Sequence, residues 1–356
     1  MLCMILVSCT GQKTGKENDN NDKIAIEVGE IKFPPQDVLQ LKSYYLSSSV
    51  HVDSIDYLIG YNYRLHSLDC MNLKSKSVTQ IVLPGDGPDA IVRLSGIYAQ
   101  SLDSVWISDE SERAFLIDSV GTIKRMIDLK KYLEDQEQLL INTNYAMFTS
   151  HLFYNASRHS LMFLVKHTPS NTFIVKEVFI DEVGKMATYQ LSSSKVVPDM
   201  SKGYAYINFP NVNFVGENIV YNYPVESSIY MLDIRTNERK YILADSHYTS
   251  NIIEKCTTSG DYATLEKHWL ENSHFYDIMY LPKYKIYARL HADKVDFDEK
   301  KGMEKLINER DLYLMLFDEN MEKIGETKLS NCRYSPFTSW NATYGGIALF
   351  VDNVLD

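Results

Sequence analysis

The chain has 356 residues and a mass of 41.0 kDa, enough for a sizeable core or for one large repetitive domain. Its 45% apolar and 23% charged residues exclude a disordered or fibrous protein, and its 25 Tyr and 14 Phe favour strands. The net charge of -11 argues against binding to nucleic acid or to an anionic membrane by charge alone. We therefore expect no nucleic-acid partner.

The N-terminus has the pattern that ends a bacterial lipoprotein signal. Leu6, Val7 and Ser8 are apolar or small, and they precede Cys9, whose thiol would carry the lipid. The eight residues before Cys9 are short for a signal and hold no basic residue, which a start codon assigned too far downstream would explain; the alternative is a chance apolar N-terminus. We predict a signal at 1–9, a lipid anchor on Cys9, and attachment to either side of the outer membrane.

The residues after the signal predict a tether and one domain. Residues 10–22 (TGQKTGKENDNND) contain no apolar side chain and predict a flexible tether. A single folded domain would then span 23–356, which has no apolar segment long enough to cross a membrane. Cys70, Cys256 and Cys332 show no metal-binding spacing; at most one disulfide can form among them, and we expect buried thiols.

A weak repeat runs along the chain: an apolar run, a turn, a second run ending in Asp, another turn and a third run. The acids are separated by 49, 63, 52 and 85 residues, and the shorter gaps approximate a four-stranded propeller blade. We expect these acids to serve turns. They are Asp69, Asp118, Asp181, Asp233 and Asp318.

The runs are apolar at successive positions, which fits sheets packed between neighbouring sheets. The predicted strands are 57–62, 64–69 and 77–83; 104–108, 114–118 and 123–129; 161–167, 173–181 and 185–191; 218–222, 229–233 and 239–243; and 279–290, 312–318 and 323–329. An unfinished copy at 345–351 and an N-terminal strand at 23–32 could pair and close a ring. The sequence therefore predicts an all-β fold, a β-propeller of six blades, with seven as the alternative.

Three segments predict small helical insertions: 130–140, 262–270 and 299–310. The last two fall in the longest gap between the acids, inside the fifth copy. We expect them to lie over one face of the ring.

Two stretches resemble a lipoprotein family of the Bacteroidetes, domain of unknown function family 4221. They are Pro84–Pro88 (PGDGP) with Leu94–Trp106 (LSGIYAQSLDSVW), and Tyr276–Leu290 (YDIMYLPKYKIYARL). The second departs from the family pattern, because Leu281 and Pro282 replace an Asp-containing turn. The resemblance implies a propeller lipoprotein of the cell envelope and supplies neither a substrate nor a catalytic residue.

No motif for catalysis, metal or cofactor appears. The chain has no HExxH, no GxSxG, no phosphate-binding loop and no complete calcium loop. His151, His159 and His167 recur every eight residues, and we expect them at the surface or hydrogen-bonded rather than on a metal. We assign no catalytic residue, no metal and no cofactor.

Three residues on a predicted strand form the candidate ligand-binding site. Tyr287, Arg289 and His291 alternate onto one face, where an aromatic plate, a planar cation and a titratable ring could grip a sugar or a carboxylate. The alternative is a Tyr–Arg stack that packs one blade on the next. A second patch has the same parity and the same alternative: Tyr204, Tyr206 and Asn208.

These features favour a monomeric, lipid-anchored binding or scaffold module that holds a glycan, a peptide or a partner protein on one propeller face. The alternatives are an envelope hydrolase or lyase with its site in the central funnel, and a structural component of a membrane complex. Convergent ionisable side chains in a deep funnel would favour the enzyme, whereas an aromatic rim would favour binding.

Overall fold

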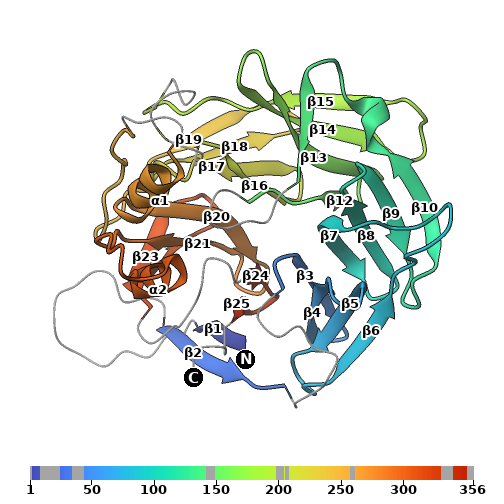
Figure 1. Cartoon of the computed structure of the whole chain (residues 1–356), viewed down its shortest axis with the longest axis horizontal. Helices are drawn as coiled ribbons and strands as arrows, with labels where there is room; N and C mark the ends of the chain where they lie inside the picture. The colour runs from blue at the N-terminus through green and yellow to red at the C-terminus, as the bar shows by residue number, and fades with distance from the viewer. Residues whose placement is uncertain are drawn as a thin grey trace.

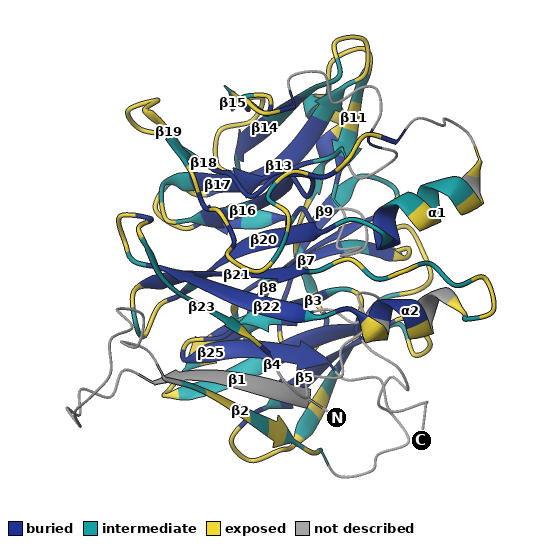
Figure 2. Cartoon of the chain, turned by 90° about the vertical axis from the view of Figure 1, so that its left-hand side faces the viewer, coloured by how far each residue is buried: buried dark blue, intermediate teal, exposed yellow. Residues whose placement is uncertain are grey.

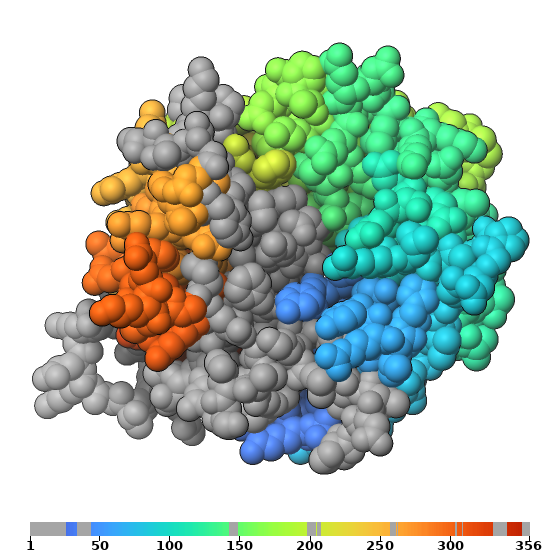
Figure 3. Space-filling model, viewed as in Figure 1, coloured from blue at the N-terminus to red at the C-terminus, as the bar shows by residue number. Residues whose placement is uncertain are grey.

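The computed structural model describes residues 2–8, 25–33, 44–141, 149–197, 204, 208–256, 261–329 and 340–350. Strands make up most of its secondary structure, so the chain is all-β as predicted. The sheets are set around a common centre in a propeller-like arrangement (Figure 1), and the described residues follow one another around the molecule in chain order (Figure 3). Cys9, the predicted tether, Tyr206 and Cys332 lie outside the described residues.

Five sheets consist of strands that succeed one another along the chain, as propeller blades do. The first sheet contains β3 (Ser47–Val52), β4 (Ile55–Asn62), β5 (Ser67–Asn72) and β6 (Val78–Val82), and the second contains β7 (Leu94–Ser101), β8 (Ser104–Asp109), β9 (Arg113–Ile117) and β10 (Ile123–Asp128). The third contains β11 (Glu137–Leu140), β12 (Phe153–Asn155), β13 (Ser160–His167), β14 (Thr172–Phe179) and β15 (Met186–Gln190). The fourth contains β16 (Asn211–Val215), β17 (Asn218–Asn222), β18 (Ile229–Asp233) and β19 (Arg239–Ile242), and the fifth contains β20 (His274–Leu281), β21 (Ile286–Ala292), β22 (Leu312–Phe317) and β23 (Lys323–Lys328). The predicted run 279–290 is therefore a hairpin of β20 and β21.

A further sheet joins the two ends of the described chain in the order β2, β1, β25, β24. Its strands are β1 (Leu2–Ser8), β2 (Ala25–Ile31), β24 (Trp340–Ala342) and β25 (Gly346–Phe350). The predicted strand 23–32 corresponds to β2, but β1 lies between it and β25. The sequences explain this order, because β1 (LCMILVS) is apolar at successive positions, whereas β2 carries the exposed Glu27 and Glu30, which suit an outer edge.

The middle strands are apolar on both faces because neighbouring sheets cover them. All six residues of β22 are buried, and β13 is buried from Ser160 to Val165. The side view shows these buried strands inside the ring, with exposed residues gathered at the turns and outer edges (Figure 2). The core therefore lies between the sheets, as the apolar runs predict.

Two helices occupy predicted insertions on one face of the ring (Figure 2). In α1 (Tyr262–Leu270), the Asp261 side chain caps the helix by accepting from Thr264 N. In α2 (Met303–Glu309), Leu306 and Ile307 are buried in the core.

The helix predicted at 130–140 is wrong. That segment forms a 3-10 turn over Leu129–Tyr132 and then β11. Asp128 caps the turn by accepting from Lys130 N, and β11 pairs with β13, placing Leu140 in the core.

The five strand-ending acids fall into three kinds, of which Asp181 is one: it is exposed at a turn, and its Oδ1 accepts from Arg125 Nη1 at 3.1 Å. Oδ1 of Asp118, Asp233 and Asp318 each accepts two backbone N–H groups of the following turn, as predicted. The turn prediction is wrong for Asp69, which lies buried inside β5. Its carboxylate is satisfied by hydrogen bonds from four side chains: Tyr44, Asn62, Ser67 and Gln80.

Cys70 and Cys256 both lie in buried positions, and Cys70 is a free thiol. Burial, with a smaller contribution from Asp69, raises the pKa of the Cys70 thiol to about 12. Cys70 is therefore protonated at neutral pH.

Candidate functional site

The predicted trio on β21 shares one face, as its alternation requires. The Phe275 ring on β20 stacks on His291 with ring centroids 5.4 Å apart, and its centroid lies 4.8 Å from the guanidinium carbon of Arg289. All three side chains of the trio are buried. Tyr287 packs in the apolar cluster that joins β17 and β18 to β21 and β22.

The polar atoms of the trio are largely occupied by protein. Arg289 donates from Nη1 to Ser227 O at 2.5 Å and from Nη2 to Ala244 O at 2.9 Å, next to the neighbouring strands β18 and β19. His291 Nε2 lies 3.0 Å from Glu326 Oε1 on β23. These contacts favour the alternative in which the trio packs one blade on the next.

The described residues of the second predicted patch do not form an exposed surface. Tyr204 is buried in the core cluster around β13, β17 and β18, and Asn208 is half-buried. Neither Tyr204 nor Asn208 lines the central pocket. Tyr206 lies outside the described residues.

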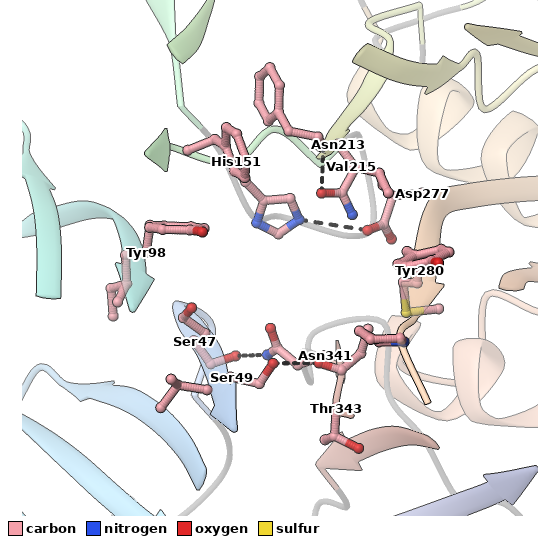
Figure 4. Close-up of a pocket in the computed structure, with 18 of the residues that line it drawn as sticks. Ser47, Ser49, Tyr98, His151, Asn213, Val215, Asp277, Tyr280, Asn341 and Thr343 are labelled. Carbon is pink, nitrogen blue, oxygen red and sulfur yellow. Dashed lines mark hydrogen bonds and ion pairs between the residues drawn. The ribbon is translucent and has the colours of Figure 1, made fainter. Parts of the chain in front are cut away.

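A pocket of about 400 Å³ lies at the centre of the ring (Figure 4). Residues of β3, β7, β12, β16, β20 and β24, the strands nearest the centre, all line it. Innermost strands in a propeller surround a central channel instead of pairing with one another. The volume falls within the range of about 300–1,000 Å³ that is usual for small-molecule sites.

One wall of the pocket is aromatic. Tyr98 on β7 meets Phe153 on β12 edge-on, with ring centroids 5.1 Å apart, and Phe153 stacks on Phe214 of β16 at 5.0 Å. Burial, followed by the effect of Tyr154, raises the pKa of Tyr98. The Tyr98 hydroxyl is therefore neutral at physiological pH and can both donate and accept a hydrogen bond.

The charged group of the pocket is Asp277 on β20, the one carboxylate among the described lining residues, which include no Lys or Arg. Its Oδ1 accepts from Trp340 Nε1 at 3.0 Å, and its Oδ2 lies 3.6 Å from His151 Nε2. The Asp277 side chain is 3% exposed. In Figure 4 the His151 ring lies between Tyr98 and Asp277.

Some polar side chains of the pocket form hydrogen bonds that join the inner strands, and others have atoms without a hydrogen-bond partner in the described chain. Asn213 Nδ2 donates to Ile278 O at 2.9 Å, which ties β16 to β20. Asn341 Nδ2 donates to Ser47 Oγ at 2.5 Å, which ties β24 to β3. Among the lining atoms that have no hydrogen-bond partner in the described chain are Tyr98 Oη, His151 Nδ1 and Asn341 Oδ1.

His151 lines this pocket, although its sequence pattern predicts no functional role for it. The other two histidines of that series, His159 and His167, do not line the pocket. Several inner strands are short or mixed in composition, such as Ser47–Val52 (SSSVHV) and Phe153–Asn155 (FYN), and so lack a long two-sided apolar pattern. The sequence offers one signal by which these inner strands could be found: β3, β7, β12 and β16 each lie just before the first predicted strand of a repeat.

The described residues contain neither a metal-binding group of side chains nor a helix that could span a membrane. No group of three or more His, Cys, Asp or Glu in them is placed to hold a metal. No helix among them is both long and apolar enough to cross a membrane.

Comparison with known proteins identifies the family. The sequence model described as "Domain of unknown function (DUF4221)" matches residues 17–328, and no curated protein matches the chain. A crystal structure of a DUF4221 family member from Bacteroides vulgatus has a TM-score of 0.68 at 14% identity, over 90% of this chain and 94% of that one. A putative exported protein from Bacteroides fragilis has a TM-score of 0.47 at 13% identity, over 84% of this chain and 74% of that one. Because the family model matches most of its length, the chain belongs to the DUF4221 family.

Proposed function

We propose that the protein is a ligand-binding module of the cell envelope, anchored by a lipid on Cys9, and that its ligand binds in the central pocket. The convergence of three unpartnered polar atoms, on Tyr98, His151 and Asn341, beside an aromatic wall carries this proposal. A concave site with a few placed polar groups is the usual form of a small-molecule site. A glycan or the end of a peptide fits this description.

We also propose that the sheet of β24, β25, β1 and β2 is the sixth blade and closes the ring. The antiparallel pairing of Leu2–Leu6 with Gly346–Phe350 and the contribution of β24 to the pocket support this closure. A chain that is lipidated on Cys9 cannot contain β1, because cleavage before Cys9 removes residues 2–8. In a cleaved chain, β2 takes the place of β1 beside β25 if the ring stays closed.

Intact-mass measurement of the native protein, extracted from membranes with detergent, tests the anchor. We expect a mature chain that begins at Cys9 and carries a diacylglyceryl group. The Cys9→Ser variant serves as the control and should lack the lipid mass. A native chain that retains residues 1–8 without lipid would contradict the anchor.

Native mass spectrometry of protein purified from its own envelope tests the pocket. We expect a co-purified small molecule that is lost in Tyr98→Ala, because this change removes part of the aromatic wall and one free hydroxyl. Tyr248→Ala is the matched control, since the half-exposed Tyr248 does not line the pocket. A ligand kept equally by both variants, or a wild-type protein that binds nothing, would rule out the pocket.

A second candidate function is an envelope hydrolase or lyase, favoured by the pair of His151 and Asp277. A carboxylate beside an imidazole is the arrangement of many general bases. If this candidate is right, the wild-type protein cleaves envelope glycans, and Asp277→Asn slows cleavage by about 100-fold or more. Binding without any turnover would leave the binding module as the function.

A further inference from the structure

We infer that the central pocket selects a neutral sugar and rejects acidic sugars. The inference rests on the proposed binding function and narrows its ligand to one chemical class. It depends on three features of the pocket: the sign of its charge, the kind of polar atoms left free, and the aromatic wall.

The charge of the pocket disfavours an acidic ligand. The carboxylate of Asp277 is the charged group among the described lining residues, and no Lys or Arg stands there to neutralise a second anion. A uronic acid would bring its carboxylate into a concave site that already holds a negative charge. Burial of an unpaired charge is strongly unfavourable, and a nearby like charge adds to the penalty.

The free polar atoms suit hydroxyl groups. Tyr98 Oη both donates and accepts, Asn341 Oδ1 accepts, and His151 Nδ1 donates or accepts according to its tautomer. The indole N–H of Trp340, a group that can only donate, is already used by Asp277. A sugar hydroxyl can match each free atom because it is both donor and acceptor, whereas an anionic group accepts only.

The aromatic wall suits the other side of a sugar ring. Tyr98, Phe153 and Phe214 form a continuous row across three sheets, with ring centroids 5.1 and 5.0 Å apart. A pyranose has apolar C–H groups on its ring faces and hydroxyls around its rim. Such a ring can place its C–H groups on the aromatic row while its rim reaches the free polar atoms.

Calorimetric titration of the purified chain tests this inference. The probes are glucose, galactose, mannose and N-acetylglucosamine, their disaccharides, and the acidic counterparts glucuronate and galacturonate. We expect at least one neutral sugar to bind, with its acidic counterpart at least tenfold weaker. Tyr98→Phe should weaken neutral-sugar binding by about five- to tenfold, the usual effect of one lost hydrogen bond. Tyr248→Phe, outside the pocket, should leave it unchanged.

A charge variant isolates the reason for the selectivity. Asp277→Asn keeps an oxygen to accept from Trp340 Nε1 and removes the negative charge. We expect Asp277→Asn to lower the ratio of the two affinities, neutral sugar over acidic sugar, by at least fivefold. Equal binding of neutral and acidic sugars by the wild-type protein, absence of neutral-sugar binding, or an unchanged affinity in Tyr98→Phe would overturn the inference. If a co-purified ligand were then still lost in Tyr98→Ala, the binding function itself would stand.

Discussion

Replacement of Arg289 by alanine is expected to lower the free energy of unfolding by about 3–5 kcal/mol. The change leaves the buried carbonyl oxygens of Ser227 and Ala244 without their donor. It also removes the guanidinium from between the rings of Phe275 and Phe317, whose centroids lie 4.8 and 5.8 Å from its central carbon. Burial lowers the pKa of Arg289 to about 9, so the side chain is still charged at neutral pH.

Urea denaturation of the folded chain measures this loss. Arg93→Ala is the control, because the Arg93 side chain is 73% exposed and its removal should change stability by less than about 0.5 kcal/mol. A loss below about 1 kcal/mol in Arg289→Ala would contradict the packing role. Loss of ligand binding with unchanged stability would instead restore Arg289 as a ligand-binding residue.

Replacement of Glu326 by glutamine is expected to cost about 2–3 kcal/mol at pH 7 and to flatten the acid side of the stability profile. Burial alone would raise the pKa of Glu326, but hydrogen bonds from His291, Ser246 and the backbone of His247, together with the charge of Lys323, lower it to about 2. The ordinary pKa is 4.5, so the carboxylate stabilises the fold above pH 4.5. This stabilisation is lost as the pH falls from 4.5 towards 2.

Unfolding free energies measured from pH 7 down to pH 2 test this expectation. The wild-type protein should lose stability more steeply below pH 4.5 than Glu326→Gln does. Glu322→Gln, at an exposed position in the same strand hairpin, should follow the wild-type profile. Parallel profiles for the wild-type protein and Glu326→Gln would show that the carboxylate of Glu326 contributes nothing to acid sensitivity.

The sequence predicts the middle and outer strands because their chemistry repeats. Strands such as Leu312–Phe317 are covered on both sides by neighbouring sheets, so they are apolar at every position. Their turns repeat the same Asp side chain, as Asp118 and Asp318 show. These two signals are local, and they are enough to predict a propeller-like arrangement.

The pocket could not be predicted in the same way. Its strands line a channel, so their composition is mixed and irregular, as in Ser47–Val52 (SSSVHV). His151 lies just before β12 and Asp277 lies on β20 of another sheet, so their proximity depends on how the intervening sheets are arranged around the centre. The alternation of Tyr287, Arg289 and His291 shows correctly that they share a face, but only the neighbouring sheet decides that this face is buried.

The decisive measurement for the proposed binding site is a crystal structure of the chain soaked with the neutral sugar that binds best. We expect the sugar in the central pocket, with its ring against Tyr98 and Phe153 and its hydroxyls within hydrogen-bond distance of His151 and Asn341. A sugar bound elsewhere on the protein, with the central pocket holding water alone, would contradict the proposed site.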